Sequence, residues 1–153
     1  MRVALGSDHA GYDLKTLLIE TLSGWGHDVV DEGTDSATRS VDYPDFGAAV
    51  GRAVVQGRAD LGVAVCGSGI GISIAANKVP GVRAALVHDV TSARLAREHN
   101  DANVLCLGAR LIGPLVAVDA LEAWLTASPS AGRHLERLAK LNALDERLVT
   151  EER

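Results

Sequence analysis

The fold of this chain is decided by one stretch, Leu61-Gly-Val-Ala-Val-Cys-Gly-Ser-Gly-Ile-Gly-Ile-Ser-Ile-Ala-Ala-Asn77. It opens with a short apolar run, which is typical of a parallel strand buried on both faces. Glycine then occupies every second position, at Gly67, Gly69 and Gly71, before an apolar segment that predicts a helix. A strand, a glycine-rich turn and a helix in this order predict an α/β fold with a parallel sheet.

The same turn is a candidate anion site. The first N–H groups of a helix have no partner within it, so the turn is suited to a phosphate, a carboxylate or an enediolate. Cys66 stands at its mouth, and a thiol at a helix N-terminus ionises more readily than a free one. Cys66 is therefore a candidate nucleophile or base, although most free cysteines are small buried residues. The spacing excludes the G-x-G-x-x-G dinucleotide fingerprint and the P-loop.

Length and composition limit the possible functions. The 153 residues suffice for one domain with a sizeable core, so we expect a single domain over residues 1–153. A formal net charge of −5 argues against nucleic acid as a partner. With no apolar run of transmembrane length and no signal peptide, we expect no membrane partner and a cytoplasmic protein. Its two cysteines, Cys66 and Cys106, should be reduced there, and no zinc-ligand spacing is present, so no metal is expected.

The rest of the chain repeats the strand–helix pattern. Strands are predicted at residues 2–6, 27–31, 61–65, 82–87 and 104–107, with helices between them, of which the one before the last strand is predicted at Val90 to Glu98. This order predicts a Rossmann-like, doubly wound domain with a five-stranded parallel sheet flanked by helices. Ligands of such sheets bind beyond the carboxyl ends of the strands. That rule would bring together the polar residues that follow four of the strands, namely Asp8, His9, Cys66 to Gly71, His88, Asp89 and Arg110.

A last helix is predicted from about residue 133 to the C-terminus, and no strand follows it. Its leucine stripe consists of Leu135, Leu138, Leu141, Leu144 and Leu148. Such a stripe needs a covering surface, either the helix's own domain or a second subunit. We favour a second subunit.

The same helix carries a candidate phosphate site. Arg133 and Arg137 lie four residues apart and so share a helix face, where they suit a phosphate dianion. Taken alone, such a pair is more often a solvated face.

Several segments together resemble type B ribose-5-phosphate isomerase. They are Gly6-Ser-Asp-His-Ala-Gly11, Asp42-Tyr-Pro-Asp45, Cys66 to Lys78, Glu98-His-Asn-Asp101 and Gly132-Arg-His134. The resemblance runs from residue 3 to about residue 140, and the Cys66 to Lys78 block is its specific part. The wider family includes allose-6-phosphate and galactose-6-phosphate isomerases. One branch has a glutamate at the position of Ile72, so Cys66 places this chain in the cysteine branch.

The resemblance implies a role for each matching residue. Cys66 is expected to be the base that moves a proton between C1 and C2 of the opened sugar, with the Ser68 hydroxyl in support. His99 is expected to open the sugar ring, with Asp8 as a candidate helper. The enediolate would lie against the backbone amides of Gly67 to Gly71, which include those of Gly69 and Ile70. The remaining substrate and phosphate ligands would be His9, Tyr43, Asn100, Arg110, Arg133 and Arg137.

The function implied by the resemblance is a cofactor-independent aldose–ketose isomerase that interconverts ribose 5-phosphate and ribulose 5-phosphate through ring opening and a cis-enediolate. The site would lie between the subunits of a homodimer, or of a dimer of such dimers, which agrees with the leucine stripe. Two alternatives remain open. The substrate could be a related sugar such as allose 6-phosphate or galactose 6-phosphate. The same loop could instead serve a nucleotide-binding regulatory module, an interpretation that gives Cys66 no role.

Overall fold

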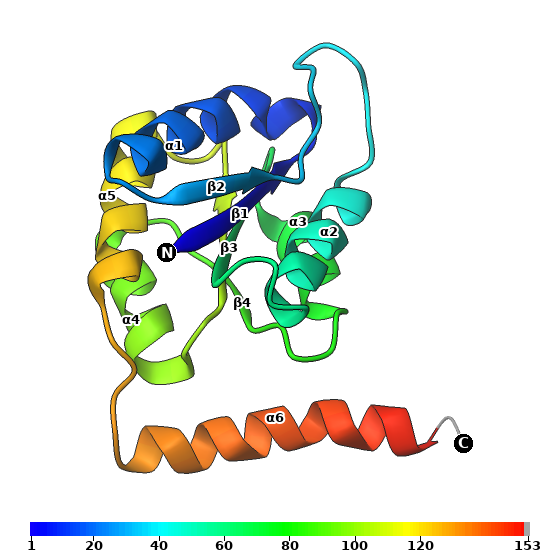
Figure 1. Ribbon diagram of the computed structural model, residues 1–153, viewed down its shortest axis with the longest axis vertical. Helices are drawn as coiled ribbons and strands as arrows, with labels where there is room; N and C mark the ends of the chain where they lie inside the picture. Colours follow the sequence, from blue (N-terminus) through cyan, green and yellow to red (C-terminus); the bar gives the residue numbers. More distant parts are fainter. Residues whose placement is uncertain (152–153) are drawn as a thin grey trace.

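The computed structural model describes residues 1–151, with side chains described as far as Asp145, and is built around one sheet. Its strands are β1 (Arg2–Ser7), β2 (Asp28–Asp31), β3 (Leu61–Cys66), β4 (Ala84–Leu86) and β5 (Val104–Gly108). All neighbouring strands pair in parallel, in the order β2-β1-β3-β5-β4 (Figure 1). The predicted five-stranded parallel sheet is confirmed.

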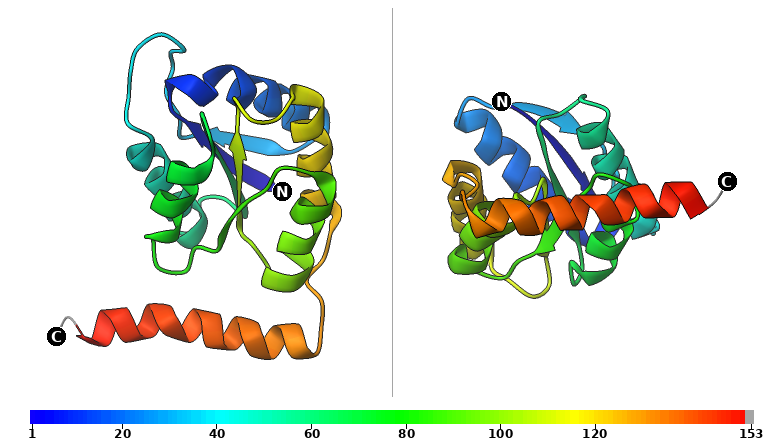
Figure 2. Two further views of the ribbon diagram at one scale, coloured as in Figure 1. Left: turned by 180° about the vertical axis from the view of Figure 1, so that it is seen from behind. Right: turned by 90° about the horizontal axis from the view of Figure 1, so that it is seen from below.

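Helices cover both faces of this sheet (Figures 1 and 2). They are α1 (Tyr12–Gly24), α2 (Tyr43–Val55), α3 (Ile70–Asn77), α4 (Val90–Asn100) and α5 (Pro114–Thr126), with a short 3-10 turn at His9–Gly11. Buried side chains of α1, α4 and α5 pack on one face, and those of α2 and α3 pack on the other. Along residues 1–151, no helix is both long and apolar enough to cross a bilayer.

The central strand β3 is buried along its whole length. Successive side chains of a strand point to opposite faces of the sheet, so Val63 and Val65 join the core under α1 and α5. Ala64 and Cys66 join the core under α2 and α3. The thiol of Cys66 therefore lies on the same side of the sheet as α3, the helix that follows it directly in the chain.

Two elements have boundaries that differ from the sequence prediction by more than one residue. The predicted strand 82–87 is shorter, because the N–H of Val82 closes a turn onto the Val79 carbonyl at 3.1 Å before β4 begins. The helix predicted to end at Glu98 continues to Asn100. It ends where Asp101 adopts a left-handed conformation, with φ 44°, a role that the sequence pattern assigns to glycine.

The last helix, α6 (Arg133–Glu151), lies apart from both layers and crosses the amino-terminal edge of the sheet (Figure 2). Little of its own domain covers it, since Leu135, Leu141 and Leu144 are 54%, 43% and 52% exposed. Leu148, which the predicted stripe also includes, lies outside the residues whose side chains are described. The predicted helix is confirmed, and its stripe is only partly covered within one copy of the chain.

Candidate active site

Cys66, the last residue of β3, is 4% exposed and is held by the turn that follows it. Its Sγ accepts a hydrogen bond from the N–H of Gly69 at 3.1 Å. Gly69 has φ +76°, and a Cβ there would lie 2.5 Å from the Leu86 Cδ1. Only glycine permits this turn. The turn thus aims a backbone N–H at the sulfur.

The amides of the turn divide into two groups. The N–H of Gly69 is engaged by the Cys66 sulfur, and the N–H of Ile70 donates to the Ser68 Oγ at 3.2 Å. These two amides of the predicted cradle therefore already donate to acceptors within the turn and are not free for a ligand. The amides that donate to no acceptor among the described residues are those of Gly67, Ser68, Gly71 and Ile72. Compared with the predicted range Gly67 to Gly71, the free amides exclude those of Gly69 and Ile70 and add that of Ile72.

Tyr43 and Arg110 lie against the same turn. A Cβ on Gly71 would come within 2.5 Å of the Tyr43 Cζ, so the ring at the start of α2 covers that glycine. Arg110 follows β5, and its N–H donates to the Gly67 carbonyl at 2.9 Å. A Cβ on Gly67 would lie 3.3 Å from the Arg110 Nη1, and no described carboxylate pairs with this guanidinium. An aromatic ring and a cation therefore flank the free amides.

Asp8 and His9 follow β1 at the same edge of the sheet. The Asp8 carboxylate is buried and accepts the N–H of Gly11 at 3.0 Å, so it caps the 3-10 turn. The His9 Nδ1 accepts the N–H of Val41 at 3.2 Å. An imidazole that accepts at Nδ1 carries its proton on Nε2. His9 can therefore serve the predicted phosphate as a neutral N–H donor.

His99 lies at the opposite edge of the sheet, in the last turn of α4, the helix that leads into the amino end of β5. Cys66 pairs with Gly108, the last residue of β5, whereas His99 stands in the last turn of α4, ahead of the first residue of β5. A strand of this length spans about 13 Å. One copy of the chain therefore does not bring the predicted base and the predicted ring-opening group together.

His99 has a neighbour that sequence reasoning missed. Its ring stacks on that of His134, with centroids 4.2 Å apart and planes 9° from parallel. Desolvation lowers the pKa of His134, and the positive charges of His99, Arg133 and Arg137 lower it further. Both arginines are exposed and pair with no described carboxylate. This second cluster is cationic and suits a dianion. The motif Gly132-Arg-His134 contains this histidine and could have identified it as a candidate site residue.

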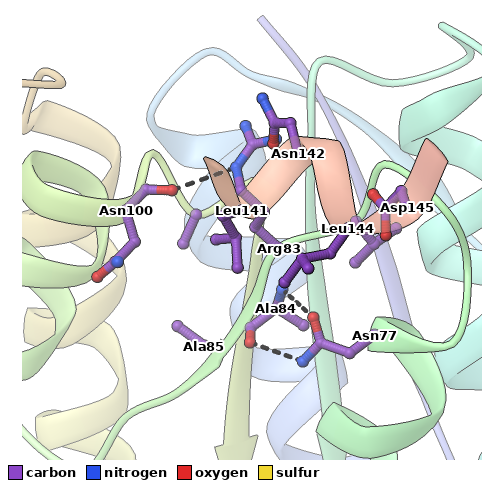
Figure 3. A pocket seen from close by; sticks show the side chains of 11 residues that line it. Asn77, Arg83, Ala84, Ala85, Asn100, Leu141, Asn142, Leu144 and Asp145 are labelled. Carbon is purple, nitrogen blue, oxygen red and sulfur yellow. Dashed lines mark hydrogen bonds between the residues drawn. The ribbon is translucent and has the colours of Figure 1, made fainter. Parts of the chain in front are cut away.

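Away from Cys66, a cavity of about 380 Å³ lies between α6 and the start of β4 (Figure 3). Asn100, Arg83 and Leu141 are among its lining residues, and Cys66 and the glycine turn are not. It therefore borders the cationic cluster and does not contain the predicted base. Among residues with described side chains, no three His, Cys, Asp or Glu are grouped so that they could hold a metal ion.

Comparison with known proteins covers nearly the whole chain. A family model described as Ribose/Galactose Isomerase matches residues 3–141. Ribose-5-phosphate isomerase B of Escherichia coli (strain K12) is 42% identical over 146 residues, which are 95% of this chain and 97% of that protein. The structure of ribose-5-phosphate isomerase B of Clostridium thermocellum matches with a TM-score of 0.94 and 47% identity, covering 97% of this chain and 99% of that one. The Mycoplasma genitalium protein of the same name, solved with bound ribulose-5-phosphate, matches with a TM-score of 0.91 and 38% identity, covering 95% and 96%.

Proposed function

Since the chain belongs to the ribose/galactose isomerase family, we propose that it is an aldose–ketose isomerase that interconverts ribose 5-phosphate and ribulose 5-phosphate. The observation that carries this proposal is the Cys66 thiol, which the Gly69 N–H holds at 3.1 Å beside amides that have no other acceptor. The ribulose-5-phosphate bound to the Mycoplasma genitalium relative supports the choice of sugar.

The proton transfer needs a base and a place for the charge that develops. The Cys66 thiolate takes the proton from C2 of the open-chain aldose. The electron pair of that C–H bond forms the C1–C2 double bond, and the π pair of the carbonyl moves to the oxygen on C1. The resulting cis-enediolate lies against the free amides of Gly67, Ser68, Gly71 and Ile72. The proton of the C2 hydroxyl then passes to the oxygen on C1, and the thiol returns its proton to C1, where the electron pair of the double bond forms the new C–H bond. This leaves a hydroxyl on C1 and a ketone at C2. Each amide of this kind contributes about 3 kcal/mol of transition-state stabilisation.

Ring opening is required in one direction only. Ribose 5-phosphate is mostly a five-membered ring closed between O4 and C1, so the aldose must be opened before its C2 proton can leave. Ribulose 5-phosphate has no such ring, because its O5 is esterified by the phosphate. We assign ring opening to His99, with Asp8 as its candidate helper. Proton transfer by a positioned side chain of this kind accelerates a step by about 10²- to 10⁴-fold.

The phosphate would be held by groups from both clusters. Arg133 and Arg137 donate charge-assisted hydrogen bonds from α6, and Arg110 and the His9 Nε2–H donate from the carboxyl ends of the strands. Tyr43 and Asn100 would contact the sugar itself. An open-chain sugar has many rotatable bonds, so fixing its phosphate end brings the reacting carbons into register with Cys66.

The site is completed by a second copy of the chain. Cys66 and His99 lie at opposite edges of the sheet in one copy, so both act on one sugar only if the carboxyl edge of one copy faces the amino edge of another. The exposed leucines of α6 provide apolar surface for that association. We therefore propose a homodimer with shared sites. In this arrangement the arm α6 carries Arg133 and Arg137 to the partner.

The description of the family names galactose beside ribose, so a hexose 6-phosphate is the second candidate substrate. The test is a panel of pentose 5-phosphates and hexose 6-phosphates, including allose and galactose 6-phosphates, assayed for aldose–ketose conversion. We expect ribose 5-phosphate to give the highest kcat/KM, by about tenfold or more, because one extra carbon misplaces the reacting atoms. A hexose 6-phosphate that exceeds it would assign the alternative substrate. Nucleotides that raise the melting temperature, with no sugar phosphate converted, would refute the isomerase.

A further inference from the structure

The Arg83 side chain forms hydrogen bonds with the C-terminal end of α4, the helix that carries His99. Its Nε donates to the carbonyl oxygens of Asn100 at 3.2 Å and of Asp101 at 3.1 Å. Its Nη2 donates to the same Asp101 carbonyl at 2.9 Å and to the Asp101 Oδ2 at 3.2 Å (Figure 3 shows the bond to Asn100). The last carbonyls of a helix have no partner within it, so one guanidinium fork closes the C-terminal turn of α4 immediately behind His99.

Asp101 holds this turn in an uncommon backbone conformation. Among the described residues it is the only one other than glycine with positive φ, at 44°. A second guanidinium, that of Arg97, donates to the other oxygen of the Asp101 carboxylate. Non-glycine residues adopt this conformation rarely. The two arginines therefore fix Asp101, and with it the direction in which the preceding His99 and Asn100 leave the helix.

The same guanidinium also reaches α6. Its Nη1 donates to the Asn142 Oδ1 at 3.3 Å. The backbone from which the side chain starts is itself fixed, because the N–H of Arg83 donates to the Asn103 Oδ1 at 2.7 Å. The side chain is 18% exposed. Arg83 thus joins the turn that carries His99 and Asn100 to the helix that carries Arg133 and Arg137.

We propose that Arg83 is a positioning residue for the isomerisation: it sets His99 and Asn100 in place relative to the phosphate-binding arginines of α6. It touches no reacting atom and acts through the end of α4. The inference rests on the proposed function, in which His99 opens the aldose ring. Because His99 acts in the ring opening, a disturbed His99 should slow the isomerisation as a whole, and Arg83 should matter less in a chain that lacks the His99 imidazole.

The test replaces Arg83 by glutamine in the wild-type chain and in a His99→Ala chain, and measures kcat/KM from ribose 5-phosphate. In the wild-type chain, losing hydrogen bonds from a charged group should lower kcat/KM about 10- to 100-fold. In the His99→Ala chain the further loss should be clearly smaller, because only Asn100 and the phosphate contact are left to disturb. Arg83→Lys keeps the charge and loses the fork, so it should recover part of the activity in the wild-type chain.

Arg94→Gln is the matched control. Arg94 also stands on α4, where its Nη1 pairs with the Glu98 Oε2 at 2.6 Å, but among the described side chains it reaches neither Asp101 nor α6. It should keep kcat/KM within about twofold of wild type, since exposed pairs of this kind contribute little. Equal losses from Arg83→Gln in the two chains, or full activity of Arg83→Gln, would overturn the proposal.

A readout independent of activity separates this proposal from the proposed function. The ring protons of His99 and His134 report the stack between them by NMR. Arg83→Gln should shift both sets of signals, and Arg94→Gln should leave them in place. Unchanged signals in Arg83→Gln would refute the positioning role.

A second variant is needed if Arg83→Gln does not fold. Asp101→Asn then serves in its place, because asparagine tolerates positive φ, with the same expected and contradicting results. A wild type that converts no sugar phosphate would refute the proposed function and leave the NMR test valid.

Discussion

The two edges of the sheet carry chemistry of different kinds. At the carboxyl edge, Cys66 and Asp8 are 4% and 6% exposed, and each accepts a hydrogen bond from the backbone of its own turn. At the amino edge, Arg133 and Arg137 lie exposed on a helix that stands apart from both layers of the fold. The first edge is fixed by the core of one copy. The second presents its groups outward, and we propose that a partner receives them.

This difference gives each edge its own mutational signature. A change at the carboxyl edge should remove the chemical step in both directions of the reaction. A change at His99 should remove the opening of the aldose ring by the enzyme, so that the sugar must open in solution before it reacts. A change on α6 should act mainly on the affinity for the phosphate.

Cys66→Ala should lower kcat by about 10³-fold or more in both directions, because no other group at the turn can carry the proton. Binding of the sugar phosphate, measured by calorimetry, should change little, since the free amides and the arginines remain. Cys106→Ala is the control. Cys106 is fully buried in β5, where burial raises the pKa of its thiol, and its replacement should leave kcat nearly unchanged. A Cys66→Ala enzyme that keeps a tenth of the wild-type rate would mean that another group is the base.

His99→Ala should lower kcat/KM from ribose 5-phosphate by about 100-fold. The loss in kcat/KM from ribulose 5-phosphate should have the same size, because the equilibrium constant fixes the ratio of the two values. The two directions should differ at high enzyme concentration: the rate from ribose 5-phosphate should level off at the rate at which the sugar opens in solution, whereas the rate from ribulose 5-phosphate, which is already open, should stay proportional to enzyme. Initial rates over a range of enzyme concentrations provide the comparison. A rate from ribose 5-phosphate that also stays proportional to enzyme would assign ring opening to another group, with Asp8 the next to test.

Arg137→Ala should raise KM for ribose 5-phosphate by about 10- to 100-fold, since a hydrogen bond to a charged group contributes about 1.5–3 kcal/mol. The accompanying fall in kcat should be smaller. Arg137→Lys should recover only part of the affinity, because it loses the planar fork. Unphosphorylated ribose should be a poor substrate that is indifferent to the mutation. An equal loss on ribose and on its phosphate would show that Arg137 supports structure rather than phosphate binding.

The sequence predicted the fold well because its signals are local. An apolar run, a glycine turn and a helical period are each written within a few residues, and the parallel sheet follows from their alternation. Most errors fell at the ends of elements, such as the extension of α4 to Asn100. That helix ends at Asp101, whose conformation is held by Arg83 and Arg97. The contact with Arg83 joins residues 18 positions apart in the chain, and no local pattern contains it.

The candidate site could be predicted only in part. The rule that ligands bind beyond strand ends placed Asp8, Cys66 and Arg110 together correctly at one edge. The rule does not cover His99, which lies at the amino edge, because it stands in the last turn of a helix and does not follow a strand. Residue identity did not show which amides of the turn are free. That depends on the bonds from the Gly69 N–H to Cys66 and from the Ile70 N–H to Ser68. These two hydrogen bonds depend on how the turn folds in three dimensions, and no residue type in the sequence predicts them.

In the proposed dimer, each site uses Cys66 of one copy and His99 of the other. Cys66→Ala and His99→Ala chains, carrying different affinity tags, are co-expressed, and the doubly tagged hybrid is purified and assayed from ribose 5-phosphate. A hybrid dimer with shared sites has one site with both groups intact and one with neither, so about half of the wild-type activity per dimer is expected, although each parent keeps only about a hundredth or less. A hybrid no more active than its parents would show that each site is built within one copy, and would contradict the shared site.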